Sequence, residues 1–250
     1  MGLGAGGIDA VAWRSGWRRR SVAEKTVLLG GVVGLTLVLP PWPTLVLLLA
    51  LCLGISRSAQ VPLTHLGRCL RAPAVFIGLA TASTVVAVDT APWRVSVSDQ
   101  AVAHSVQLGG RAIVATVAMV LFASTTPMTM VMTSLRRIGV PIACVEVITV
   151  MYRMTFILLE SIAVTRDAQA ARLGYSTAWR AMNSAGLLTA AVLVRAWAQA
   201  RRLDAGLAGR DFGVPMPVLD AVAVQWRFVA ASIAALVGIC VLSFSVAVLG

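Results

Sequence analysis

Two clusters of small residues, each built around an arginine, have the composition best suited to chemistry in this chain. One spans residues 168–175 (Ala-Gln-Ala-Ala-Arg-Leu-Gly-Tyr) and the other spans residues 205–212 (Ala-Gly-Leu-Ala-Gly-Arg-Asp-Phe). A guanidinium stays charged and can form two parallel hydrogen bonds with a carboxylate, while small neighbours let a second protein approach the backbone. These features favour docking onto another protein over catalysis.

The two arginines, Arg172 and Arg210, also have a simpler interpretation. Each is expected near the C-terminus of a helix, where a solvated cation stabilises the helix by about 0.3–1 kcal/mol. In a desolvated pair with a partner's carboxylate, by contrast, removing the arginine costs about 2–5 kcal/mol. Asp211 complicates the second cluster, because its carboxylate either competes for the Arg210 guanidinium or caps a following turn. Local sequence leaves both interpretations open.

The composition indicates an integral membrane protein. Of the 250 residues, 58% are hydrophobic and only 12% are charged, and the mean hydropathy is +0.87. The net charge of +11 comes almost entirely from arginine, since Lys25 is the only lysine. Because the arginines flank apolar segments, they favour a topology signal over nucleic-acid binding.

Metal binding and ATP hydrolysis by this chain are not expected. The four cysteines form no CxxC pair, and the two histidines are isolated from other ligand side chains. These residues are Cys52, Cys69, Cys144, Cys240, His65 and His104. The sequence contains no Walker motif, nucleophile elbow or HExxH motif, so any ATP hydrolysis must come from partners.

Five apolar segments are predicted to cross the membrane. They are residues 27–39, 44–55, 74–88, 109–124 and 229–249. The proline cluster at residues 40–43 favours a tight hairpin between the first two over one kinked helix. Only Arg94 and Arg111 fall on the other side from the remaining 19 of the 21 cations, which predicts a cytoplasmic N-terminus and a multi-pass protein of the cell membrane.

The segment at residues 141–164 is apolar enough to span a membrane, but it carries Glu146, Arg153 and Glu160 on one helix face. Because three ionisable groups are costly inside a bilayer, a long helix at or below the membrane surface is favoured. The three side chains are candidates for a structural ion network. We therefore predict long helices at 141–173 and 177–209, preceded by a short helix at 127–138 that stops at Gly139 and Pro141.

The expected fold class is an all-α integral membrane protein with about five transmembrane helices plus a cytoplasmic domain of these two long helices and one short helix. The expected boundaries follow the apolar segments. They are 1–23 for a cytoplasmic tail, 24–126 for the first four transmembrane helices, 127–222 for the cytoplasmic domain and 223–250 for the last transmembrane helix.

The central strings of this sequence resemble the T components of energy-coupling factor transporters, and most closely the CbiQ group of cobalt importers. The resemblance is densest between residues 124 and 212. It is carried by Ser-Thr-Thr-Pro at 124–127, Leu-Arg-Arg-Ile-Gly-Val-Pro at 135–141, Glu146, Met-Tyr-Arg-Met-Thr-Phe-Ile-Leu-Leu-Glu at 151–160, and the first arginine cluster.

The resemblance implies a non-catalytic scaffold with two crossed coupling helices whose ends dock onto two ATP-binding cassette ATPases. The membrane part would hold a substrate-binding S component similar to CbiM, with or without a small CbiN-like subunit, and ATP and Mg²⁺ would be bound by the ATPases. The docking positions implied are Ala171, Arg172 and Gly174 in the first cluster, and Ala208, Gly209 and Arg210 in the second.

The second cluster departs from the family's usual Ala-Arg-Gly, because glycine stands in the alanine position and Asp211 in the glycine position. Two alternatives to a cobalt importer remain. One is the same scaffold serving nickel or a vitamin S component. The other is a membrane-bound enzyme whose arginines bind a phosphorylated or lipid substrate.

Overall fold

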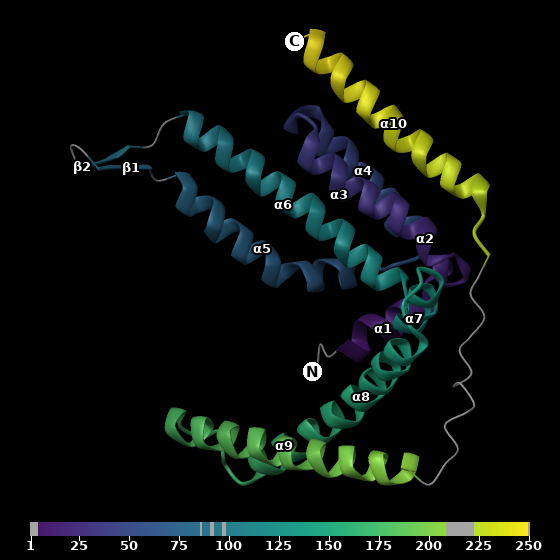
Figure 1. The fold of residues 1–250 in the computed structure, drawn as a ribbon. Coiled ribbons are helices and arrows are strands. Elements are labelled where there is room, and N and C mark those ends of the chain that lie inside the picture. Colours follow the sequence, from purple (N-terminus) through teal and green to yellow (C-terminus); the bar gives the residue numbers. More distant parts are fainter. Residues whose placement is uncertain (1–4, 86, 91–92, 97–98, 209–222, 250) are drawn as a thin grey trace. The chain divides into compact units, whose positions relative to one another are not determined.

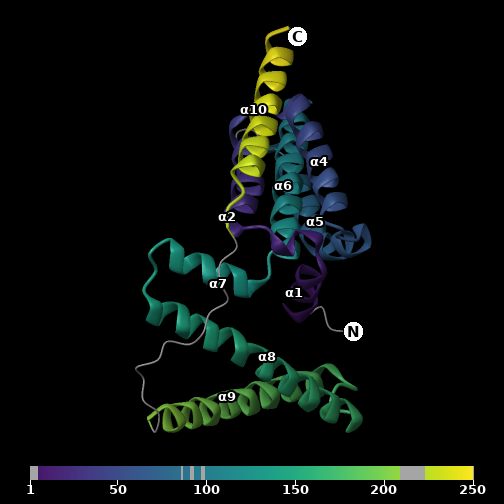
Figure 2. The ribbon, with the colours of Figure 1, turned by 90° about the vertical axis from the view of Figure 1, so that its right-hand side faces the viewer.

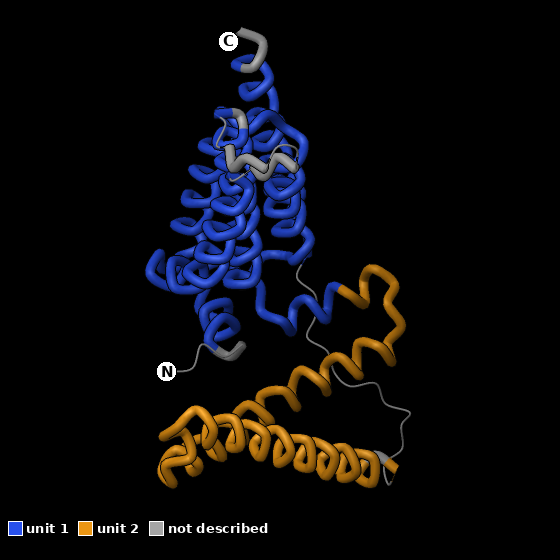
Figure 3. The backbone as a smooth tube through the Cα atoms, turned by 90° about the vertical axis from the view of Figure 1, so that its left-hand side faces the viewer, with its two compact units in different colours: residues 1–134, 221–250 blue, residues 135–220 orange. Residues whose placement is uncertain are grey.

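The computed structural model describes residues 5–85, 87–90, 93–96, 99–208 and 223–249. The chain divides into two compact units (Figure 3). The first unit comprises residues 1–134 and 221–250, and the second comprises residues 135–220. The two passages of the chain between the units therefore lie within α7 (Met128–Arg137) and before α10 (Trp226–Leu249).

The first unit is a bundle of helices centred on α6 (Asp99–Thr125), which packs against α1, α3, α4 and α5 (Figure 1). Its remaining elements are α1 (Ala5–Arg14), η1 (Gly16–Arg19), α2 (Val22–Lys25), a π-helical turn η2 (Thr26–Gly30), α3 (Gly31–Val38), α4 (Pro41–Ser58), α5 (Leu63–Val85) and α10. Apolar side chains from η2, α3, α4 and α6 form the core, among them Leu29, Val32, Leu48 and Leu121. Burial of this cluster holds the helices together.

The predicted hairpin at the proline cluster is confirmed. The chain leaves α3 at Leu39 and enters α4 at Pro41. Both the Ser15 hydroxyl and the Gly16 N–H donate to the Ala59 carbonyl, at 3.0 and 3.1 Å. The end of α4 therefore returns to the residues that precede the first apolar segment, and α3 and α4 pack against each other, as a hairpin requires.

Two helices of the first unit are longer than predicted. α5 begins at Leu63 rather than Ala74, and it continues through Pro73. α6 begins at Asp99, well before the expected start near Gly109. The reason is that α5 and α6 pack along each other, and the Thr84 and Ser105 hydroxyls are 2.8 Å apart. The predicted outside loop shrinks to a short antiparallel hairpin of β1 (Ala87–Thr90) and β2 (Trp93–Ser96).

Apart from this hairpin, the secondary-structure elements of the described residues are helices, which confirms an all-α membrane protein. Five helices are long and apolar enough to cross a membrane by length and composition: α4, α6, α8 (Ile142–Ala171), α9 (Ala178–Ala208) and α10. The number matches the prediction, but the set differs. α5 falls short because it carries Arg68 and Arg71, and the helix that contains most of residues 27–39 is short and includes the π-helical turn η2. The chain is a multi-pass membrane protein, whereas the cytoplasmic placement of α8 and α9 stays a prediction.

The second unit is a hairpin of two long helices. Gly139, with φ of +94°, ends α7, and Pro141 is the N-cap of α8, as predicted. α8 and α9 lie close together near the turn at residues 172–177 and diverge away from it (Figure 2). Most side chains of both helices are exposed. Apolar residues such as Met151 (63% exposed) and Trp197 (63%) are therefore available to another surface.

Candidate functional site at the tip of the long-helix hairpin

The first arginine cluster forms the end of α8 and the turn into α9. The Leu173 N–H donates to the Ala170 carbonyl at 3.0 Å, and the Gly174 N–H donates to the Gln169 carbonyl at 2.9 Å. This pair of bonds is the Schellman motif, with Arg172 as the C-cap. Leu173 occupies the left-handed position at φ of +57°. A glycine usually stands there, because a side chain costs roughly 1–2 kcal/mol in that conformation.

Gly174 is required by the packing of the turn itself. A Cβ atom at this position would lie 2.7 Å from the Ser184 Oγ and 2.8 Å from the Gln169 carbonyl oxygen. The Ser184 hydroxyl donates to the Gly174 carbonyl at 2.9 Å, so the first turns of α9 contact the glycine directly. The small residue therefore allows close approach within the chain, in addition to any role toward a partner.

Gln169 joins the two helices through its side-chain amide. Its Nε2 donates to the Ser184 carbonyl at 3.1 Å, and the Tyr175 hydroxyl donates to its Oε1 at 2.8 Å. These bonds fix the turn from α8 and from α9 at once. In the sequence, Gln169 and Tyr175 stand out only as members of the first arginine cluster, and no local pattern indicates Ser184.

Arg172 is presented at this fixed turn. Its side chain is exposed and forms no hydrogen bond or ion pair with the residues that the structure describes. Ala171, immediately before it, is also exposed and leaves the approach to the guanidinium open. A rigid turn that carries an unpaired cation suits recognition of a carboxylate, because little side-chain and backbone freedom is lost on binding.

The second arginine cluster is only partly described. Ala208 is exposed and is the last residue of α9. Gly209, Arg210 and the adjacent Asp211 lie outside the described residues. The docking role predicted for this end of α9 therefore stays a prediction.

The three α8 residues predicted as candidates for an ion network differ in burial. Glu146 is half-buried, while Arg153 and Glu160 are exposed. Within the described part of the chain, no salt bridge joins Arg153 to either glutamate. Instead, a hydrogen bond connects the two long helices at this level, because the Arg195 guanidinium of α9 donates to the Ser161 hydroxyl of α8.

Where α8 and α9 diverge, they enclose a groove of about 320 Å³. It is lined by apolar residues of α8 and by a mixture of basic, polar and apolar residues of α9. The residues are Val150, Met151, Met154, Ile157, Leu158, Arg195, Ala196, Gln199, Ala200, Arg202 and Leu203. The unequal lining fits an amphipathic surface better than a small charged ligand.

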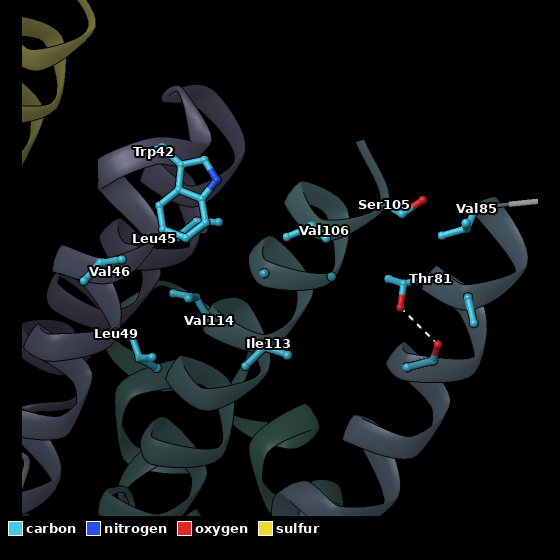
Figure 4. A pocket seen from close by; sticks show the side chains of 14 residues that line it. Trp42, Leu45, Val46, Leu49, Thr81, Val85, Ser105, Val106, Ile113 and Val114 are labelled. Carbon is cyan, nitrogen blue, oxygen red and sulfur yellow. Dashed lines mark hydrogen bonds between the residues drawn. The ribbon is translucent and has the colours of Figure 1, made fainter. Parts of the chain in front are cut away.

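A larger cavity of about 540 Å³ lies in the first unit between α4, α5 and α6 (Figure 4). Its walls are almost entirely apolar, with Trp42, Leu45 and Val106 among the labelled side chains. The Thr81 and Ser105 hydroxyls, which also line it, already donate to carbonyls of their own helices at 2.8 and 2.7 Å. The cavity therefore offers no ligand set for a divalent cation.

Metal-binding side chains are also not gathered elsewhere in the described residues. No three His, Cys, Asp or Glu side chains lie close enough together there to hold an ion. The four cysteines are all free thiols.

Comparison with known proteins places this architecture among transport proteins. Residues 14–219 match the CbiQ family, described as cobalt transport protein. The cobalt transport protein CbiQ of Rhodobacter capsulatus is 35% identical over 214 residues, which are 85% of this chain and 87% of that protein. An uncharacterised protein of Methanocaldococcus jannaschii is 29% identical over 115 residues, which are 46% of this chain and 43% of that protein.

Proposed function

Because the chain belongs to the CbiQ family of cobalt transport proteins, we propose that it is the membrane scaffold, or T component, of an energy-coupling factor importer for cobalt. In this role it binds two ATP-binding cassette ATPases and a membrane S component that carries the ion. ATP and Mg²⁺ are bound by the ATPases, and this chain itself is not an enzyme.

The observation that carries the proposal is Arg172, exposed on the fixed turn between α8 and α9. A carboxylate in a groove of an ATPase would pair with the guanidinium in one geometry. Because the turn is held by Gln169, Tyr175 and Ser184, a displacement of that groove moves the ends of both helices together. Arg210 is the corresponding docking position at the other end of α9.

The two long helices suit the transmission of movement. α8 has 30 residues and α9 has 31, so each is about 45 Å long at 1.5 Å per residue. The exposed apolar side chains along them and the 320 Å³ groove are available to an S component. Movement of the ATPases on ATP binding would then shift this surface and reorient the S component. The arginine distribution supports a cytoplasmic location for α8, α9 and the N-terminus.

The docking assignment is tested by charge reversal at the turn. Arg172→Glu together with Arg210→Glu should abolish co-purification of the ATPase subunits in mild detergent, while membrane insertion remains. Arg166→Glu is a matched control, because Arg166 is exposed on the same helix, six residues before Arg172. Full retention of the ATPases by the double variant, or equal loss in the control, would contradict the assignment.

The identity of the cargo is tested by the partner. The S component that co-purifies with the chain should bind cobalt, whereas nickel or a vitamin bound to it would assign the same scaffold to that substrate. Calorimetry on the isolated chain should show no appreciable cobalt binding. Micromolar affinity there would overturn the scaffold role, and metal-dependent turnover of a lipid or phosphorylated compound would favour an enzyme.

A further inference from the structure

The N-terminal segment, residues 7–25, contacts the ends of four helices in the first unit. It contains most of α1, then η1 and α2. The helix ends are those of α4, α6, α7 and α10, and each contact is a hydrogen bond to a backbone group at or next to the terminus. Helix termini leave backbone groups without intrahelical partners, so such contacts satisfy groups that would otherwise be unpaired.

Lys25 holds the C-terminus of α6. Its side chain is fully buried (0% exposed), and its Nζ donates to the carbonyl of Thr125, the last residue of α6, at 2.6 Å. The C-terminal end of a helix carries a partial negative charge. An ammonium group therefore matches both the free carbonyl and the sign of the helix dipole.

Glu24 holds the start of α10. It is also fully buried (0% exposed), and its Oε1 accepts a hydrogen bond from the N–H of Gln225, the residue before α10, at 2.7 Å. The N-terminal end of a helix carries a partial positive charge, which the carboxylate matches. Arg20 adds to this junction, because its guanidinium lies 3.8 Å from Glu24 and 4.0 Å from the ring centroid of Phe228 in the first turn of α10.

Asp9 holds the start of α7 in the same manner. Its Oδ1 accepts from the N–H of Met128, the first residue of α7, at 3.1 Å. Its other oxygen accepts from the Trp13 indole N–H at 3.1 Å, which fixes the carboxylate on α1. Asp9, Glu24 and Lys25 thus each carry the sign of charge that the helix end they contact favours.

These contacts lie where the chain passes between the two units. The chain leaves the first unit after Ser134, and Thr125 and Met128 lie shortly before that point. The chain re-enters the first unit at Ala221, and Gln225 lies shortly after it. Stability alone does not call for buried charges at this place, because a buried ion pair can often be replaced by apolar residues without loss. Their position indicates that they hold the ends of α6, α7 and α10, where the chain leaves and re-enters the first unit, to the N-terminal segment.

We propose that the N-terminal segment is a clamp in which Asp9, Glu24 and Lys25 fix the two junctions of the first unit so that movement of α8 and α9 reaches the membrane helices. This inference rests on the proposed scaffold function. Without the clamp, the ends of α6, α7 and α10 would fray and absorb the displacement. The three residues are positioning residues and contact neither ATP nor the transported ion.

The clamp is tested by the double replacement Glu24→Met with Lys25→Met in the complete transporter reconstituted in lipid vesicles. Removing both charges avoids leaving either one buried alone, so the fold and assembly should persist. ATP hydrolysis should stay within about twofold of the original, whereas cobalt uptake should fall about tenfold, which is a loss of roughly 1.4 kcal/mol in coupling. Arg19→Met is the matched control, since Arg19 is a neighbouring but exposed cation.

Hydrogen exchange of backbone amides tests the same contacts without requiring transport. In the full complex, Glu24→Met should speed exchange at residues 225–228, and Asp9→Ala should speed it at residues 128–131, each without affecting the other. Glu24→Gln, which keeps a hydrogen-bond acceptor, should restore protection at 225–228. Unchanged exchange in both variants would overturn the clamp, as would uptake and ATP hydrolysis that fall in proportion.

The clamp and the scaffold function fail in different ways. If the unaltered chain does not assemble with ATPases or support uptake, the scaffold function is wrong. If the unaltered transporter works and the double variant couples hydrolysis to uptake equally well, only the clamp is wrong.

Discussion

The two units of this protein use charged side chains in opposite ways. In the first unit, Glu24 and Lys25 are completely buried and bonded to helix ends. In the second, the Arg172 side chain is exposed at a turn and forms no hydrogen bond or ion pair with a described residue. A buried charge must have its partners within the chain, whereas an exposed one on a rigid turn is available to another molecule. The contrast separates charges that organise the membrane body from a charge that is exposed to another molecule.

The largest effect is expected from Lys25→Met alone. This change leaves the buried carbonyl of Thr125 without its donor and removes the positive charge next to the buried Glu24, while Arg20 stays 3.8 Å from that carboxylate. Leaving a buried polar group unsatisfied costs about 1–3 kcal/mol, and more where a charged group is involved, so the folded chain should be destabilised by about 3 kcal/mol. Unfolding of the purified chain in detergent would measure it.

The double replacement of Glu24 and Lys25 by methionine should recover the part of that loss that comes from a buried carboxylate beside a missing ammonium, whereas the Thr125 carbonyl stays without its donor. If the single and double variants lost equal stability, the loss would come from the Thr125 carbonyl alone and not from the charge next to Glu24. Arg19→Met should change stability by less than about 0.5 kcal/mol, as for an exposed site.

A smaller effect is expected from Gly174→Ala at the tip. The new methyl group would press on the Ser184 hydroxyl and the Gln169 carbonyl oxygen. Overpacking of this kind costs about 1–3 kcal/mol, and here it should loosen the turn and weaken ATPase binding. Gly186→Ala is the control, because a Cβ there meets nothing within 4 Å. Thermal unfolding and the pull-down together distinguish the two variants.

Tyr175→Phe should have a more modest effect on the same turn. It removes the hydroxyl that donates to the Gln169 side chain at 2.8 Å. A single hydrogen bond contributes about 0.5–1.5 kcal/mol. The amides at residues 172–175 should therefore exchange roughly two- to twelvefold faster. Unaltered exchange there would show that Ser184 alone holds Gln169 in place.

Leu173→Gly should have the smallest effect and the opposite sign. Glycine accepts the left-handed conformation at φ of +57° that leucine occupies under strain. The turn should become more stable by up to about 1 kcal/mol, offset in part by the greater freedom of glycine in the unfolded chain. A thermal unfolding temperature that falls would show that the exposed leucine side chain contributes contacts of its own.

The helices of the second unit could be predicted closely, and those of the first unit less so. Gly139 adopts a positive φ just after α7, and Pro141, which has no N–H, stands just before α8, so both lie between helices as expected. The start of α5 was missed because hydropathy falls at Arg68 and Arg71, although a helix can continue past an apolar segment. A pattern of apolar residues locates a membrane segment better than it locates the ends of a helix.

The sequence indicates the arginine of the candidate site, but it does not indicate the residues that hold the turn in place. Arg172 was singled out by its small neighbours, whereas Ser184 contacts the turn from a distance of ten residues that no local pattern reveals. Lys25 shows the same limit more clearly, since the topology argument counted it as one more cytoplasmic cation. Only the fold brings its side chain next to Thr125, which lies 100 residues later in the sequence. Long-range partners of single polar residues are set by packing.

The burial of Lys25 has a practical consequence for labelling studies of the assembled transporter. It is the only lysine in the chain, and its ammonium is completely shielded from solvent. Amine-reactive dyes and lysine-directed cross-linkers should therefore modify the side chains of the other subunits and leave this one untouched. Any lysine adduct found on this chain would report that the bundle around residue 25 has opened.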